Sequence, residues 1–248
     1  MADTDTPGDA AFHARNTDMT RRMIADPHVR DATREWVHAV LPYEYHYHFS
    51  WLGVPIIQFP SDIVAMQELV WAVKPDLVIE TGIARGGSLI FYASMLELLG
   101  GDGRVVGVDV DIRSHAREAI DAHPLGRRIV TVQGSSIDDS TVAGVARHVD
   151  GRQRVLVVLD SNHTQEHVAA ELRLYSRFVT CGSFIVVFDT VIDDVPDRFH
   201  EGRPWKTGRG PKAAVREFLA ANPDFGVDRT YEDKLLVTVS PEGFLKRT

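Results

Sequence analysis

The chain reads Asp76-Leu-Val-Ile-Glu80-Thr-Gly82-Ile-Ala-Arg85-Gly86-Gly87-Ser88 at the point that decides its fold. An apolar run ends in a carboxylate, and a glycine-rich turn then leads straight into a segment of helical character. Gly82 permits the tight turn, while Gly86 and Gly87 let a ligand approach the backbone and the first N–H groups of the helix. We expect a strand, a turn and a helix with a ligand at the carboxyl end of the strand, although such a turn can also serve only to pack a helix on a strand.

The same alternation of apolar runs and helical segments continues along the chain. Five runs are predicted to be strands, at residues 77–80, 104–109, 129–133, 154–160 and 183–189. Segments of helical character alternate with them, at residues 62–73, 87–99, 113–122, 141–148 and 164–178. Runs such as VLVVLD and FIVVFD are apolar on both faces, as parallel strands between two helix layers must be. A helix at 211–221 and a closing strand pair at 225–229 and 235–239 complete the pattern. The sequence therefore predicts an α/β fold with a doubly wound, mostly parallel seven-stranded sheet.

The first forty residues have a different character. Residues 1–15 carry few apolar side chains and are expected to fray. Apolar residues recur at helical spacing over 17–40, but Asp26-Pro27 interrupts them, because proline lacks a backbone donor. The sequence predicts two short helices here, which form an N-terminal helical extension to the sheet.

Two other segments are predicted to cover a site. Residues 43–60 are dense in aromatic side chains and proline. His46 and His48 could bind a metal if this segment were a strand, but the surrounding aromatic side chains favour a lid over a substrate. The segment 191–210 is long, polar and rich in glycine and proline, which is typical of a functional lid or a mobile loop.

Composition excludes several classes of protein. The 248 residues are 44% apolar and 25% charged, which fits a soluble globular protein and excludes a disordered or collagen-like chain. With 27 basic and 35 acidic residues, the formal net charge of −8 argues against binding of nucleic acid or an anionic membrane. The single cysteine, Cys181, can form no internal disulfide and is expected in the core. The polar N-terminus is unlike a signal peptide, so a cytoplasmic location is expected.

The chemistry of the first strand tip indicates the ligand. The dinucleotide pattern G-x-G-x-x-G is absent because Ala84 stands where the second glycine is required, and the P-loop pattern is absent too. The Glu80 carboxylate would repel a pyrophosphate but suits an ammonium group. S-adenosylmethionine carries such an amine and a cationic sulfur, so it is the predicted cofactor. Asp109, at the tip of the second strand, is expected at the ribose hydroxyls. Ser135 and Ser136 could border the adenine, unless they only satisfy a turn.

The fourth and fifth predicted strands end in Asp160 and Asp189. If these strands are neighbours, the two carboxylates project into one crevice, where a divalent ion, Mg²⁺ first, is the natural bridge. His163 follows Asp160 closely enough to act as general base on a substrate hydroxyl. The alternatives are that Asp160 caps the next helix and that His163 is an ordinary surface histidine. Asp193 could complete the metal shell, or it could be a solvated loop charge.

Three sequence motifs of this chain resemble those of the cephalosporin hydroxylase/rhamnosyl O-methyltransferase family. They are Trp51-x-Gly53-x-Pro55-x-x-Gln58-x-Pro60-x-Asp62, Glu80-Thr-Gly82-Ile-Ala-Arg-Gly-Gly-Ser88 and Leu159-Asp160-Ser-Asn-His163-Thr. The resemblance extends from about Trp51 to the carboxyl end. It implies a class I, Rossmann-like S-adenosylmethionine-dependent methyltransferase with bound Mg²⁺, which acts in natural-product pathways on deoxysugar hydroxyls or on the cephem ring.

The resemblance also implies roles for individual residues. It implies Glu80, Gly82 and Ser88 near the methionine end of the cofactor and Asp109 at its ribose. Arg85 and Asp160 are further candidates for cofactor binding. Asp160 and Asp189 would ligate the metal, and His163 has the spacing of the base in related macrolide sugar methyltransferases. Such enzymes tend to have Glu-Asp at the end of the fifth strand, whereas this chain has Phe188-Asp189. The third protein ligand therefore stays open, with Asp193 or a water as candidates.

Together these features predict a function and a division of the chain. Residues 1–60 would form a helical and aromatic lid, and residues 61–248 the S-adenosylmethionine-binding methyltransferase domain. The expected activity is Mg²⁺-dependent O-methylation of a sugar hydroxyl on a glycosylated natural product, in antibiotic or macrolide biosynthesis. The alternatives are a cephalosporin 7-hydroxylase or methoxylation component and a non-catalytic partner that only binds the cofactor. The expected partners are a small-molecule glycoside or other natural product and further copies of the chain in a homo-oligomer.

Overall fold

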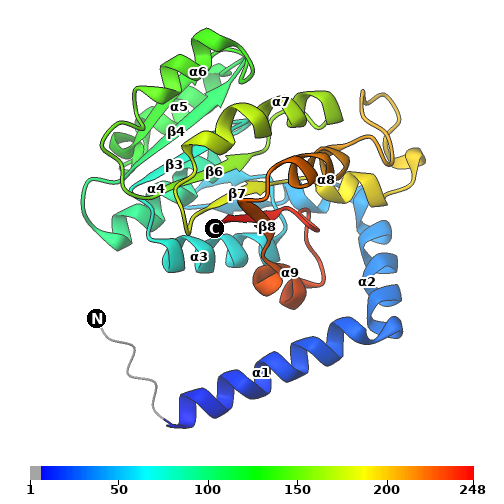
Figure 1. Cartoon of the computed structure of the whole chain (residues 1–248). Coiled ribbons are helices and arrows are strands. Elements are labelled where there is room, and N and C mark those ends of the chain that lie inside the picture. Colours follow the sequence, from blue (N-terminus) through cyan, green and yellow to red (C-terminus); the bar gives the residue numbers. More distant parts are fainter. Residues whose placement is uncertain (1–6) are drawn as a thin grey trace.

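A seven-stranded sheet lies at the centre of the computed structural model, which describes residues 7–248 (Figure 1). Its strands, in spatial order, are β5 (Ile129–Gln133), β4 (Arg104–Asp109), β3 (Leu77–Thr81), β6 (Val155–Leu159), β7 (Phe184–Val187), β9 (Phe244–Arg247) and β8 (Phe225–Val227). The first five are parallel, and β9 is antiparallel to both of its neighbours. The predicted doubly wound, mostly parallel sheet is confirmed.

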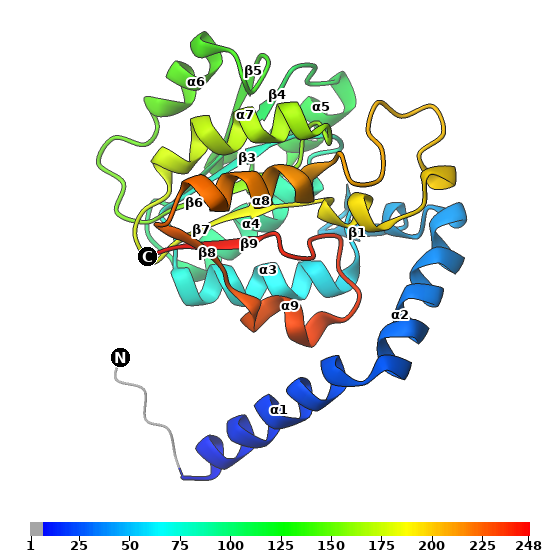
Figure 2. The same ribbon diagram turned by 45° about the vertical axis from the view of Figure 1, so that its right-hand side comes forward.

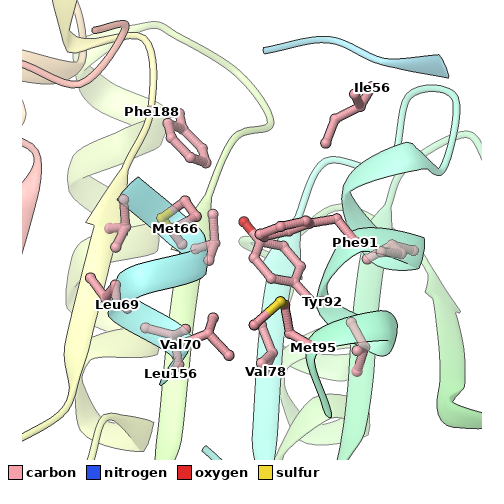
Figure 3. Close-up of a cluster of buried hydrophobic side chains, with 14 of the residues drawn as sticks. Ile56, Met66, Leu69, Val70, Val78, Phe91, Tyr92, Met95, Leu156 and Phe188 are labelled. Carbon is pink, nitrogen blue, oxygen red and sulfur yellow. The ribbon is translucent and has the colours of Figure 1, made fainter. Parts of the chain in front are cut away.

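Helices cover both faces of this sheet. Those on one face are α3 (Pro60–Val73), α4 (Gly87–Leu99) and α5 (Ser114–Ala122), and those on the other are α6 (Asp139–Ala146), α7 (Gln165–Tyr175) and α8 (Pro211–Ala221). A hydrophobic core lies on each face of the sheet, and successive strand residues point to the two cores alternately. Val78 faces α3 and α4, whereas Ile79 faces the opposite helix layer. Figure 3 shows the first core, where side chains of α3 and α4 meet. Full burial of each such side chain contributes about 1.5–3 kcal/mol.

The N-terminal segment forms two helices, α1 (Pro7–Ala25) and α2 (Pro27–Val40), as the break at Asp26-Pro27 predicts. Asp26 caps α2 by accepting a hydrogen bond from the His28 N–H at 2.9 Å. The expectation that residues 1–15 fray is wrong for 7–15, which are helical because no proline or glycine interrupts the chain from Asp9 to Ala25; residues 1–6 lie outside the described residues. Figures 1 and 2 show α1 standing away from the sheet and approaching α9 (Arg229–Leu235).

Between α2 and α3 the chain forms two short 3₁₀ helices, η1 (Leu41–Tyr43) and η2 (Tyr45–Tyr47), and a small hairpin. The hairpin strands are β1 (Phe49–Trp51) and β2 (Val54–Ile56). Trp51 Nε1 donates to Ser94 Oγ on α4 at 2.9 Å. A Cβ atom at Gly87, in the first turn of α4, would lie 2.2 Å from the Pro55 carbonyl oxygen, so the glycine is what lets the hairpin approach so closely.

The predicted closing strand pair is confirmed only in part. β8 lies where the first strand was expected, but its partner is β9, and the predicted strand at 235–239 is wrong. The first residue of that segment, Leu235, ends α9. The rest is hydrogen-bonded to the start of α3: Ser61 Oγ donates to the Val237 carbonyl at 2.6 Å, and the Asp62 carboxylate accepts from the Val239 N–H at 3.0 Å. The prediction for Cys181 is also wrong, because this residue is exposed in the turn before β7.

The polar segment 191–210 is held by its own hydrogen bonds. It contains the 3₁₀ helices η5 (Thr190–Asp194) and η6 (Asp197–Phe199). His200 Nε2 lies 3.1 Å from both the Ile192 and the Val195 carbonyl oxygens. Its role as a lid stays a prediction. Across residues 7–248, the helices are too short or too polar for a membrane span.

Candidate active site

Glu80 and Gly82 lie at the tip of β3, where the sequence predicts a ligand. Glu80 is fully buried; Ser88 Oγ donates to its Oε2 at 2.6 Å, while Oε1 has no hydrogen-bond partner among the described residues. Burial raises the pKa of Glu80 to about 8, and the Ser88 hydrogen bond offsets this only in part. Gly82 has φ +92°, and a Cβ atom there would lie 2.0 Å from the Asp160 carbonyl oxygen. The tip therefore combines a turn that requires glycine with a buried acid that has no cationic partner within residues 7–248.

A cavity of about 400 Å³ runs from this turn along the tips of β4 and β5. Asp109 lies in it with both carboxylate oxygens engaged, accepting from the Ile83 N–H at 2.8 Å and the Asp111 N–H at 3.0 Å. These contacts fix the carboxylate and leave further lone pairs for a ligand. Ser135 and Ser136 also line the cavity. The structure thus brings the predicted ribose and adenine residues together, and their role in binding stays a prediction.

Sequence reasoning missed a polar network at the wall of this cavity. His167 Nε2 lies 3.0 Å from Ser136 Oγ and 3.5 Å from Glu171 Oε1. Glu171 is fully buried, and Ser161 Oγ donates to the same Oε1 at 2.7 Å. The signal for this network was the spacing of His167 and Glu171, because residues four apart lie on one face of a helix.

A second, smaller cavity adjoins the first on the side of the β1–β2 hairpin. It is lined by Arg85, Ser88 and Asp160, three residues that the sequence assigns to the cofactor, and also by Gln58. Gln58 is buried, and its Nε2 donates to Asp160 Oδ2 at 3.3 Å. Arg85 itself is exposed. Arg85, Ser88 and Asp160 are therefore gathered around one space, together with a side chain from the N-terminal segment.

Asp160, His163 and Asp189 form the candidate metal site. β6 and β7 are neighbours with Leu159 opposite Val187, so Asp160 and Asp189 leave the sheet side by side. One ligand atom from each of the three residues lies within 4.8 Å of the others, and His163 Nε2 is 3.1 Å from Asp189 Oδ2.

The electrostatics of this cluster favour a bound cation. Burial raises the pKa of Asp160 well above its ordinary value, and the negative charges of Asp189 and Glu80 raise it further. Asp189 holds a left-handed backbone conformation with φ 57°, which is uncommon for a residue other than glycine. Two carboxylates are ligands that a hard divalent ion prefers, so the donor set fits Mg²⁺.

Asp193, the candidate for the third ligand, and Phe188, at the position of the expected glutamate, both lie outside this cluster. Asp193 accepts from the backbone N–H groups of Gly210 and Lys212, each at 2.9 Å, and so serves the start of α8. Phe188, at the place where relatives of the predicted family tend to have glutamate, is buried against α3 and α4 near Met66 and Tyr92 (Figure 3). Among the described residues, His163 is the third group that the structure brings to the two aspartates.

A third cavity, of about 210 Å³, opens on the other side of the cluster. His163 and Asp189 line it together with aromatic side chains of both predicted covers, among them Tyr47, Phe59 and Trp205. The Trp205 ring meets the His163 ring edge-on, with 4.8 Å between centroids. His46 lines this cavity from η2 rather than from a strand, and burial lowers its pKa. Within residues 7–248, neither His46 nor His48 belongs to the metal cluster.

The cluster thus stands between the cavities at the strand tips and the aromatic cavity. Asp160 faces the cavities at the strand tips, whereas His163 and Asp189 face the aromatic cavity. Such an arrangement can hold a polar cofactor on one side and an acceptor on the other, with a cation site and an imidazole where they meet.

Comparisons with known proteins identify the family. A family model described as rhamnosyl O-methyltransferase/CmcI matches residues 43–248. The rhamnosyl O-methyltransferase of Mycobacterium bovis (strain BCG / Pasteur 1173P2) is 30% identical over 203 residues, which cover 80% of this chain and 78% of the relative. The enzyme of the same name from Mycobacterium leprae (strain TN) is 29% identical and covers 80% of this chain and 82% of its own.

Solved structures share the fold. CmcI with Mg and SAM superposes with a TM-score of 0.57 at 18% identity, over 82% of this chain and 77% of that one. The O-methyltransferase from Bacillus cereus in complex with SAH gives 0.53 at 18% identity, over 79% and 81%. The predicted Rossmann-like methyltransferase fold is confirmed, and the predicted O-methyltransferase class is confirmed at the level of the family. With the family model matching most of its length, this chain belongs to the rhamnosyl O-methyltransferase/CmcI family.

Proposed function

We propose that the chain is an S-adenosylmethionine- and Mg²⁺-dependent methyltransferase that acts on a sugar hydroxyl of a glycosylated natural product. The observation that carries the proposal is the cluster of Asp160, His163 and Asp189, which lies between the cavity at the strand tips and the aromatic cavity. This juxtaposition supports transfer of a group from a ligand on one side to a ligand on the other.

The residues of the strand tips fit the cofactor. The unpartnered Glu80 oxygen would accept a hydrogen bond from the ammonium group of S-adenosylmethionine, and the cation would favour the ionised form of the acid. Asp109 would hold the ribose hydroxyls, with Ser135 and Ser136 toward the adenine. The CmcI structure holds Mg and SAM, which supports the same pair of cofactors for this chain.

Asp160 and Asp189 would hold the metal, and His163 would take the proton. When bound, S-adenosylmethionine supplies a methyl group on cationic sulfur, and Mg²⁺ supplies positive charge that makes a nearby hydroxyl more acidic. The His163 imidazole removes the hydroxyl proton, and the Asp189 carboxylate at 3.1 Å orients the ring and stabilises the imidazolium that forms. The remaining requirement is alignment of the two reactants, which the cavities on either side of the cluster would provide.

The aromatic cavity supports a sugar acceptor. Its walls combine large apolar surfaces with a few polar groups, among them His46, His163 and Asp189, which can bind the hydroxyls of a ring while the aromatic faces exclude water. The curated relatives are named for a rhamnosyl acceptor. We place the lid in residues 43–60, together with 191–210, because both line this cavity.

A test uses the purified chain, both cofactors and a panel of rhamnosides, other deoxysugar glycosides and a cephalosporin. We expect one glycoside to gain a single methyl group on its sugar, with S-adenosylhomocysteine formed in equal amount. Turnover should disappear in EDTA and return with Mg²⁺. In the Asp189→Asn variant it should stay lost at the Mg²⁺ concentrations that restore the wild type.

The same panel separates the alternatives. An oxygen-dependent gain of one oxygen atom by the cephalosporin would instead identify a hydroxylase. Binding of S-adenosylmethionine without a methylated product from any acceptor would identify a cofactor-binding partner. Full turnover in EDTA would exclude the proposed role of the metal.

A further inference from the structure

Gln58 connects the N-terminal segment to the candidate site. It lies between the β1–β2 hairpin and α3, it is 6% exposed, and it lines the smaller cavity with Ser88 and Asp160. Its Nε2 donates to Asp160 Oδ2 at 3.3 Å. With Asp160 ionised, as a metal ligand would be, the reverse orientation of the amide would set its oxygen against the carboxylate, so the amide nitrogen is the end that faces Asp160.

The other end of this amide has no partner. Gln58 Oε1 is buried and accepts no hydrogen bond from any described residue. Leaving a buried acceptor without a donor is unfavourable, so such an atom calls for a ligand or a water. Glu80 Oε1 is a second buried acceptor without a partner, and Ser88, which donates to the other oxygen of Glu80, lines the same cavity as Gln58.

Both atoms are acceptors, so both call for the same kind of partner, a hydrogen-bond donor. An ammonium group carries three donors and no acceptor, and it is the group that Glu80 is suited to hold. We propose that Gln58 is a cofactor-binding residue, whose amide oxygen accepts a hydrogen bond from the ammonium group of S-adenosylmethionine while its amide nitrogen holds Asp160. The proposal rests on the proposed function, because it requires that this cofactor occupies the cavities at the strand tips.

One consequence concerns the N-terminal segment. Gln58 belongs to the part of the chain predicted to cover the acceptor, yet its contacts reach the cofactor side and a metal ligand. The segment that closes over the acceptor would thereby also hold the methionine end of the cofactor. Binding of the cofactor and placement of the hairpin are then linked through one side chain.

The test compares two thioether ligands by titration calorimetry on the full-length chain. S-adenosylhomocysteine carries the amino-acid group, and 5′-methylthioadenosine lacks it. Gln58→Met removes both polar atoms of the amide at similar length. It should weaken S-adenosylhomocysteine by about ten- to a hundredfold, the range for loss of a hydrogen bond to a charged group, and leave 5′-methylthioadenosine unchanged.

Two further variants sharpen the result. Gln67→Met makes the same change on α3 outside all three cavities and should leave both affinities unchanged. Gln58→Glu keeps an acceptor oxygen and should bind S-adenosylhomocysteine far better than Gln58→Met. Equal weakening of both ligands in Gln58→Met would overturn the proposal, because Gln58 would then only shape the cavity. Unchanged affinities would overturn it too, since water would satisfy the oxygen. A wild-type chain that binds neither ligand would remove the proposed function itself.

Discussion

The His163 ring is held from two sides, by the Asp189 carboxylate at 3.1 Å and by the edge of the Trp205 ring at 4.8 Å between centroids. Two chemical roles are compatible with these contacts, because an imidazole can take a proton from the acceptor or coordinate the metal. An imidazole nitrogen that coordinates the metal cannot also accept the proton of the acceptor hydroxyl. The two roles therefore predict different consequences when the ring is removed.

We predict that His163→Ala lowers kcat by roughly 10²–10⁴-fold, the usual contribution of a general base. The affinities for Mg²⁺ and S-adenosylhomocysteine should not change, because the metal keeps both carboxylates and His163 does not line the cofactor cavity. Steady-state kinetics and calorimetry measure these quantities. His148→Ala is a matched control beside Arg104, at the opposite end of the strands. A parallel loss of Mg²⁺ affinity in His163→Ala would identify the residue as a ligand rather than the base.

At the scale of elements, glycines and caps set where the site residues lie. Gly82 allows β3 to turn against the backbone of Asp160, and Gly87 allows the β1–β2 hairpin to lie against α4. The hairpin in turn places Gln58 beside Asp160. The same logic applies to segment 191–210, because the Asp193 carboxylate binds the N–H groups of Gly210 and Lys212 at the start of α8.

Asp193 therefore gives a prediction that separates a structural anchor from a metal ligand. Asp193→Ala should lower the free energy of unfolding by about 1–2 kcal/mol, as loss of a cap at a helix N-terminus does, and should leave Mg²⁺ affinity unchanged. Asp189→Ala is the control, for which Mg²⁺ affinity should be lost. Chemical denaturation and Mg²⁺ titration provide the two measurements. If Asp193→Ala instead impairs Mg²⁺ binding as strongly as Asp189→Ala, segment 191–210 contributes to the metal site.

At the scale of the whole molecule, the sequence predicts what short-range patterns encode. Strands apolar on both faces define the parallel sheet, and strand tips such as Asp160 and Asp189 meet because neighbouring parallel strands end at one edge. Long-range contacts are not encoded in this way. The segment 235–239 is mostly apolar, like a buried strand, but Asp62, 177 residues before Val239, binds it. Gln58 reaches Asp160 across 102 residues, and only the family resemblance drew attention to it.

The stability of the whole molecule depends on pH because it buries two acids far apart in the sequence. Asp62 and Glu80 are both fully buried acids, and burial raises the pKa of Asp62 from 3.8 to about 7 and that of Glu80 from 4.5 to about 8. Each folded-state pKa lies above the unfolded value, so the folded state holds these protons more tightly. Their contribution to stability is present at low pH and is lost as the pH rises to about 8. At one pKa unit per about 1.4 kcal/mol, the two groups together change the free energy of unfolding by several kcal/mol.

We predict that the ligand-free chain becomes less stable as the pH rises from about 5 to about 8, in thermal or chemical unfolding. Glu80→Gln, which cannot ionise, should flatten this dependence. S-adenosylhomocysteine should oppose it in the wild type, because its ammonium group favours the ionised Glu80 carboxylate, and its stabilising effect should therefore grow over the same range. A wild-type stability that rises steadily across this range, or a Glu80→Gln profile parallel to it, would mean that Glu80 is not a buried protonated acid in the ligand-free fold.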